Sequence, residues 1–253
     1  MGDAPSRQSP WWAFILAADR TEQANRALGV VLAFVAGAAN AGGFLVLGRY
    51  TSHMTGVLSS VADDLALGLW PAAAGGVLLV TCFLCGAAST AILVHWGRRR
   101  ATSSVYALPI VIEAVSLLLF GAVGGWLGET PLWAGVSSAL LCYLMGLQNA
   151  LITKAADAVI RTTHVTGIIT DLGIELGKLF YWNRLDHPDP AERVTANRPK
   201  LTMLSSLLGA FFVGGVCGAL GFNAVGAVAV MPLAVGLLVL AGPHVWPDLR
   251  RLG

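Results

Sequence analysis

The sequence predicts an all-α integral membrane protein with six transmembrane helices, built as two inverted three-helix repeats that each carry a re-entrant or broken helical segment. The chain is 56% hydrophobic and only 12% charged, with a mean hydropathy of +0.70. This composition leaves too little polar surface for a soluble globule. Six apolar segments are long enough to cross about 30 Å of hydrocarbon, and a short polar motif occurs once in each half of the chain.

The apolar segments divide the chain into regions. Spans are expected near residues 27–47, 72–94, 105–127, 132–152, 201–222 and 224–241. Tryptophans lie close to their ends, as in an aromatic belt at the two membrane interfaces: Trp70, Trp96, Trp126, Trp133 and Trp246. We therefore expect a cytoplasmic or interfacial segment at 1–25, a first repeat at 26–127, a second repeat at 128–242 with a cytoplasmic linker at 178–200, and a cytoplasmic tail at 243–253.

Lys and Arg predict the orientation. With the N-terminus in the cytoplasm, fifteen of the 16 basic residues fall on the inner side and only Arg49 falls outside. Because cytoplasmic loops are enriched in basic residues, both termini are expected inside. Three spans per half is an odd number, so the second half would enter the membrane upside down relative to the first.

The repeated motif is the feature around which the halves are organised. Thr, His, Thr and Gly recur in the same order and spacing, and the same offset places Asp64 on Glu175. Each copy follows an apolar segment that carries an Asn, which is Asn40 or Asn149. Such repetition in an apolar chain predicts one site made from two halves. The alternative is two ordinary polar loops between helices. The copies span Tyr50 to Gly56 and Arg161 to Gly167.

Each motif precedes a helix-compatible stretch, at 57–69 and at 168–179, that is too short and polar to span fully. We expect Thr55 and Thr166 to be the N-caps of these helices. Two helix N-termini that reach the membrane interior from opposite faces would direct positive dipole ends to the centre. This favours an anionic or carboxylate-bearing solute, although the acids further along each stretch leave a cation open.

The candidate site residues fall into two groups. The coupling group contains Glu113, which lies within an otherwise apolar span, where a charged carboxylate is costly and suggests function or a bond across helices. His53 and His164 could carry a proton or bond a neighbouring carbonyl. The residues predicted to bind substrate are Asn40, Thr51, His53, Thr55, Gly56, Gln148, Asn149, Thr162, Thr163, His164, Thr166 and Gly167, and those predicted to couple protons or ions are Glu113, Asp171, Asp64 and Glu175.

Further similarities extend the repeat. Cys85-Gly86-Ala87 resembles Cys217-Gly218-Ala219, and Pro109 has a counterpart in Pro232. Gly42-Gly43 after Asn40 would allow the first helix to break. The 30 glycines fit close helix packing, because apolar burial supplies little force between helices in lipid.

Other function classes lack their sequence signals. We find no nucleophile elbow, phosphate loop or metal cluster, and Cys82-x-x-Cys85 has no second ligand pair, so no enzyme activity, cofactor or metal is expected. Basic residues follow the orientation pattern, so nucleic acid binding is not expected. The expected partners are membrane lipid and a small-molecule solute, and a six-span bundle leaves a homodimer open.

The motifs also carry a family resemblance. The chain resembles the YoaK-like family of bacterial inner-membrane proteins, whose function is uncharacterised, over roughly 28–241. It departs from the family pattern at Asn40, where Asp is usual, and at Val57, where Asn is usual. The resemblance implies a six-span, multi-pass protein of the bacterial inner membrane, and it implies no substrate. The segments that carry it are 36–41, 52–56, 146–150 and 162–172.

These observations favour a small secondary transporter, in which inverted halves rock about a site at the membrane midplane. One alternative is a channel or passive facilitator on the same scaffold, which could not concentrate its solute. Another is a membrane scaffold or sensor that transports nothing.

Overall fold

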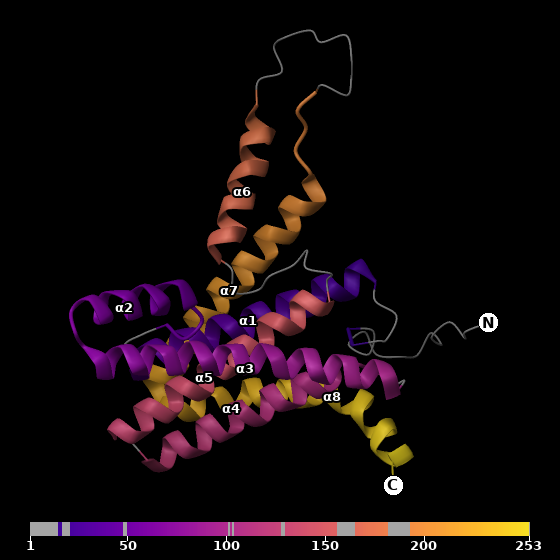
Figure 1. The fold of residues 1–253 in the computed structure, drawn as a ribbon. Coiled ribbons are helices and arrows are strands. Elements are labelled where there is room, and N and C mark those ends of the chain that lie inside the picture. The colour runs from indigo at the N-terminus through magenta and orange to yellow at the C-terminus, as the bar shows by residue number, and fades with distance from the viewer. Residues whose placement is uncertain are drawn as a thin grey trace.

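The computed structural model describes residues 15–16, 21–47, 50–100, 102, 104–127, 130–155, 165–181 and 193–252 (Figure 1). Within these ranges the chain is helical and contains no strand. Its helices are α1 (Glu22–Leu47), α2 (Met54–Ala66), α3 (Trp70–Arg100), α4 (Ala107–Leu127), α5 (Pro131–Ala155), α6 (Val165–Phe180), α7 (Arg198–Val225) and α8 (Met231–Leu252), with a 3₁₀ turn η3 (Gly226–Val230) before α8.

Five helical stretches are long and apolar enough to cross a membrane, which supports a multi-pass membrane protein. Four contain α1, α3, α4 and α5 singly, and the fifth, Arg198–Trp246, runs through α7, η3 and α8. The predicted sixth segment began at residue 224, whereas α7 continues to Val225 and α8 begins at Met231. Gly226 separates the two helices with a φ of +63°, a left-handed conformation that favours glycine.

The bundle buries an apolar core between α1, α4, α5, α7 and α8. Leu32 on α1, Phe120 on α4 and Leu144 on α5 are completely buried in it. The outer faces are also apolar: Leu84 and Ile92 on α3 and Phe212 on α7 are more than half exposed. Exposed apolar side chains such as these are expected on a surface that contacts lipid.

Two helix crossings organise the bundle, where α1 packs against α7 and α3 packs against α5 (Figure 1). At the first crossing, a Cβ on Gly37 would overlap the carbonyl oxygen of Phe211. At the second, a Cβ on Gly146 would overlap the carbonyl oxygen of Phe83 in the same way. Glycine is therefore required at both points so that the backbones can touch.

The two crossings share further matched contacts. A Cβ on Gly214 would meet the carbonyl of Phe34, and a Cβ on Gly86 would meet the carbonyl of Tyr143. Phe34 and Gly37 on α1 correspond to Tyr143 and Gly146 on α5 by one constant shift in residue number. Phe83 and Gly86 on α3 correspond to Phe211 and Gly214 on α7 by a second constant shift. The predicted match of Gly86 with Gly218 is thus wrong by four residues, since Gly86 occupies the place of Gly214.

Several expected boundaries need correction. The first helix does not break at Gly42-Gly43, because α1 runs unbroken to Leu47 and Gly42 instead gives room to the ring of Phe222. The ends of the predicted linker 178–200 are helical, since α6 extends to Phe180 and α7 begins at Arg198. Asn197 explains the second boundary: its side chain caps α7 by accepting from the N–H of Lys200 at 3.0 Å.

Candidate functional site

The first motif forms a short connection between α1 and α2 that Asn40 holds in place. The Oδ1 atom of Asn40 accepts hydrogen bonds from the backbone N–H of Ser52 at 3.3 Å and from its hydroxyl at 2.9 Å. Thr51 beside it is buried, and its carbonyl accepts from the Cys142 thiol at 3.5 Å. Thr51 thus anchors the connection, and it is not among the residues that line the two clefts described below.

His53, not Thr55, is the N-cap position of α2. His53 has non-helical φ and ψ of −94° and 67°, and its carbonyl accepts from the N–H of Val57 at 3.1 Å. The predicted cap at Thr55 is wrong because the helix has already begun at Met54. The imidazole lies against Gly56, where an added Cβ would be 2.7 Å from Nδ1. The motif glycine therefore makes room for the histidine ring.

The second motif is described only from Val165 onward, so the predicted site residues Thr162, Thr163 and His164 lie outside the described part of the chain. Thr166 and Gly167 are in the first turn of α6, which begins at Val165. Thr166 is therefore not the N-cap either. Its carbonyl accepts from the Thr170 hydroxyl at 2.9 Å within the helix.

One cleft of about 590 Å³ is lined by residues of both motifs, and we call it the two-motif cleft. Six predicted site residues line it, and six further residues complete it. The predicted ones are Asn40, His53, Thr55, Asn149, Thr166 and Gly167, and the others are Tyr50, Ser52, Met54, Phe83, Val165 and Phe211. The structure thus joins the parts of the two motifs that it describes.

Many of the lining residues form pairs related by the numbering shifts described above. Asn40 pairs with Asn149, Thr55 with Thr166, and Phe83 with Phe211. Sequence reasoning missed the two phenylalanines. The signal was Phe-x-x-Gly, which occurs as Phe83 to Gly86 and as Phe211 to Gly214. It was hidden because the cysteines of these segments suggested a register four residues away.

The electrostatic character of the two-motif cleft comes from backbone groups. The N-termini of α2 and α6 both reach it, and neither helix has an acidic residue in its first turn. Among the lining residues there is no Asp, Glu, Lys or Arg. The unpaired N–H groups of two first turns give the cleft a partial positive charge. Together with amides and hydroxyls, this suits a carboxylate or another anionic group.

Glu113 does not reach the two-motif cleft. Its side chain is completely buried on α4, and the Gln148 Nε2 donates both to Glu113 Oε1 at 2.9 Å and to the Leu32 carbonyl at 3.0 Å. In the described part of the chain, Glu113 Oε2 and Gln148 Oε1 have no hydrogen-bond partner. Glu113 therefore lies apart from the residues of the two motifs that line this cleft. Gln148 also lies in the core, while its neighbour Asn149 lines the cleft.

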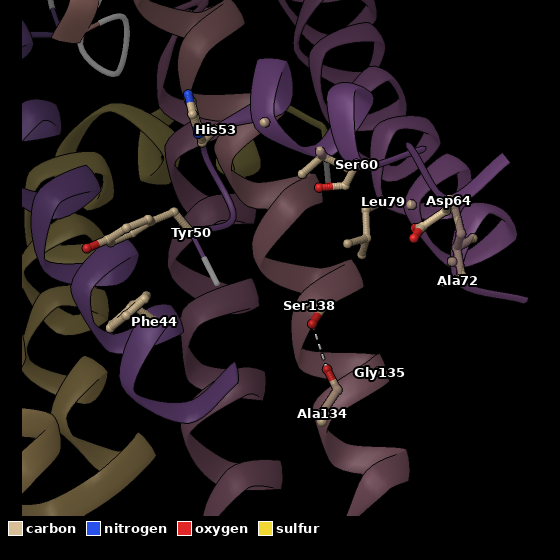
Figure 2. Close-up of a pocket in the computed structure, with 15 residues that line it drawn as sticks. Phe44, Tyr50, His53, Ser60, Asp64, Ala72, Leu79, Ala134, Gly135 and Ser138 are labelled. Carbon is tan, nitrogen blue, oxygen red and sulfur yellow. Dashed lines mark hydrogen bonds between the residues drawn. The ribbon is translucent and has the colours of Figure 1, made fainter. Parts of the chain in front are cut away.

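Three further acids lie away from the two-motif cleft. Asp64, together with Gly56, lines a second cleft of about 820 Å³ between α2, α3 and α5 (Figure 2). Glu175 on α6 is buried, and its carboxylate accepts from the Asn197 N–H at 2.8 Å and from Lys178 Nζ at 3.0 Å. The Nζ atom of Lys200 lies 3.5 Å from Asp171 Oδ2 and 3.9 Å from Glu175 Oε1.

These contacts explain the ionisation of Glu175. The hydrogen bond from the Asn197 backbone, followed by the one from Lys178, lowers the pKa of the Glu175 carboxyl below its ordinary value of 4.5. The carboxylate is thus ionised at neutral pH and joins α6 to the start of α7. Among the described residues, no three His, Cys, Asp or Glu side chains gather in a group that could hold a metal ion.

Comparison with known families identifies the group to which the chain is related. Residues 28–242 match a family model described as "Protein of unknown function (DUF1275)". The chain belongs to this family. No curated protein and no solved structure gave a match.

The DUF1275 match contains the whole site. It begins before Asn40 and ends beyond Phe211, so all residues that line the two-motif cleft fall within it. The second cleft, which contains Asp64, and the Glu113–Gln148 contact fall within the match as well. The site is therefore built from residues within the segment that matches the DUF1275 model.

Proposed function

We propose that this DUF1275 protein is a small secondary transporter, a YoaK-like inner-membrane protein with six spans in two inverted repeats. Both termini would lie in the cytoplasm. The transported solute would be small and would carry a carboxylate or another anionic group. One observation carries the proposal: a single cleft is lined by matched residues from both halves, namely Asn40 with Asn149, Thr55 with Thr166, and Phe83 with Phe211.

The matched contacts between helices support the inverted duplication. α1 meets α7 through the same pattern of glycine-to-carbonyl contacts with which α5 meets α3. Such a relation follows if α1 to α4 and α5 to α8 are two copies of one unit whose third helices exchange partners. With three spans in each copy, the copies would be inverted across the membrane. Under this proposal α2 and α6 are re-entrant helices, since each is too short to span.

The mechanism follows from the position of the cleft between the halves. The anionic group of the solute would accept from the first-turn N–H groups of α2 and α6, and the amides of Asn40 and Asn149 would orient it. The rings of Phe83 and Phe211 would cover its apolar part. Because α1 belongs to one half and α7 to the other, rocking at the glycine crossings would expose the cleft to each side in turn.

Glu113 has a coupling role in this proposal. A carboxylate that is fully buried with one unpaired oxygen is costly when charged, so its protonation would alter the packing of α4 against α5. Gln148 links it to the cleft, because Gln148 binds Glu113 and its chain neighbour Asn149 lines the cleft.

Transport by the purified protein in liposomes tests the proposal. We would impose proton and sodium gradients and measure the uptake of a panel of labelled mono- and dicarboxylates. We expect accumulation against the solute's own gradient, reduced at least tenfold in Asn149→Ala. Thr202→Ala is the control, because Thr202 is exposed on α7 and lines neither cleft. Flux without accumulation would indicate a channel, and the absence of flux for the whole panel would reject transport of carboxylates.

A further inference from the structure

The second cleft carries a feature that transport of an anion does not explain. This Asp64 cleft is lined by Phe44, Tyr50 and His53 at one part and by Ser60, Asp64, Ala72 and Leu79 at another (Figure 2). Asp64 is half-buried, and no described side chain donates a hydrogen bond to its carboxylate or forms an ion pair with it. Within the described part of the chain, this carboxylate shares the cleft with Ser60 and with apolar side chains such as Leu79, and it has no cationic partner.

In the second half, the matching carboxylate of Glu175 accepts from the Asn197 N–H at 2.8 Å and from Lys178 Nζ at 3.0 Å, and Lys200 is a second, more distant cation. The motif offset places Asp64 on Glu175, and the shift that relates α3 to α7 places Pro71 on Pro199 and Ala72 on Lys200. Lys200 Nζ lies 3.9 Å from Glu175 and 3.5 Å from Asp171. In the first half Ala72 is at the lysine position and lines the same cleft as Asp64, so it places a methyl group where the second half has an ammonium group.

We infer that the Asp64 cleft binds the ammonium group of a ligand at the position that Lys200 occupies in the second half. The inference rests on the duplication in the proposed function, because the duplication relates Ala72 to Lys200. It adds a second site with a ligand class opposite in charge to that of the two-motif cleft. His53 and Tyr50 line both clefts, so an occupant of one contacts the wall of the other.

The rest of the cleft suits an organic ammonium better than a metal ion. Asp64 is its one carboxylate, whereas Ca²⁺ and Mg²⁺ need several oxygen ligands. Phe44 and Tyr50 stack at 4.6 Å between ring centroids with an 18° angle, which gives the part of the cleft away from Asp64 an aromatic wall for the apolar body of the ligand (Figure 2). A volume of about 820 Å³ is large enough for a small amine or for the ethanolamine head of a phospholipid.

Binding to the full-length protein tests the inference. We would measure the thermal unfolding of the detergent-purified protein with phenethylammonium, using phenylpropionate as the probe of opposite charge. A second arm would use nanodiscs with and without ethanolamine lipid. We expect saturable stabilisation by phenethylammonium, by the ethanolamine lipid, or by both, and we expect any stabilisation by phenylpropionate to be the same in wild type and in Asp64→Asn. The arm that responds identifies the source of the ammonium.

Three variants assign the effect to this cleft. In Asp64→Asn the apparent affinity for phenethylammonium should fall at least tenfold. Asp63→Asn is the matched control, because Asp63 is the exposed neighbour that lines neither cleft, and its affinity should stay within twofold. Ala72→Lys should raise the midpoint of thermal unfolding in the absence of a probe, and it should remove the stabilisation by phenethylammonium. This variant decides the matter if Asp64→Asn does not fold.

Two results would overturn the inference. One is a response to the ammonium that Asp64→Asn or Ala72→Lys leaves within twofold of wild type. The other is the absence of a saturable response in both arms. Either result would leave carboxylate transport through the two-motif cleft untouched, since Asp64 is outside it. Conversely, ammonium binding without carboxylate flux would reject carboxylate transport while retaining this site.

Discussion

The amide of Gln148 donates to the carboxyl of Glu113 across 2.9 Å, in the fully buried contact between α5 and α4. The same nitrogen donates to the Leu32 carbonyl of α1, so one side chain connects three helices. Without the Gln148 side chain, the Glu113 carboxyl and the Leu32 carbonyl both lose this donor.

We therefore expect Gln148→Leu to destabilise the protein. The change should lower the free energy of unfolding by about 1–3 kcal/mol, because a buried acceptor that loses its partner is costly. SDS denaturation in mixed micelles measures it. Ser59→Ala is the control, because Ser59 is exposed on α2. An unfolding free energy equal to wild type in Gln148→Leu would mean that the contact contributes nothing.

The glycine crossings give a second prediction. Gly214→Ala should destabilise the protein by about 1–3 kcal/mol or more, since the methyl group would overlap the Phe34 carbonyl and force α1 and α7 apart. Gly209→Ala, five residues earlier on the same helix, has no atom within 4 Å of its added Cβ. It should be neutral or stabilising by up to about 1 kcal/mol. Equal effects of the two substitutions would contradict the crossing geometry.

Asn40→Asp tests the charge of the two-motif cleft. The new side chain keeps an acceptor for Ser52, so the fold should be retained. It adds a negative charge beside the N-terminus of α2, where an anionic solute would bind. We expect carboxylate affinity to fall about tenfold, which corresponds to ~1.4 kcal/mol, while Asn40→Gln changes it less. Tighter carboxylate binding in Asn40→Asp would oppose an anion site.

The contact between α6 and α7 should depend on pH. The pKa of Glu175 is lowered in the folded state by the Asn197 N–H and Lys178, so its ionised form stabilises the contact. The contribution is complete above the ordinary carboxyl pKa of 4.5 and is lost as pH falls through the lower folded value. Spin labels at the exposed Thr170 and Thr202 should show a wider distance distribution in acid.

Glu175→Gln should reproduce that wider distribution at neutral pH and remove most of its pH dependence. Asp63→Asn, on the exposed face of α2, should leave the distances unchanged. If the Glu175→Gln distances match wild type at pH 7, the ionised carboxylate is not what holds the two helices together.

The sequence predicted most of the helices because their apolar segments are long. The repeated Thr, His and Gly also indicated that the two motifs would meet, and Thr55 and Thr166 do line one cleft. The helix starts were misjudged because Thr is a common N-cap, whereas here the chain turns at His53, whose ring needs the space over Gly56. A local preference for threonine could not reveal that contact.

Other features depend on contacts between distant residues. Glu113 was noticeable as an acid in an apolar span, but only the packing of α4 on α5 shows that it meets Gln148 and not the cleft. Phe83 and Phe211 were not singled out from the sequence. Their place in the cleft follows from the two glycine crossings, whose register the cysteine pattern had obscured.

Chemical labelling from each side of the membrane tests the inverted duplication most directly. Cysteines at Ala66 and Gly177, corresponding exposed positions near the ends of α2 and α6, would be introduced one at a time after replacement of the four native cysteines. An impermeant maleimide applied to spheroplasts should label Ala66→Cys and leave Gly177→Cys unlabelled until the membrane is opened. Labelling of both positions from the same side would contradict the account.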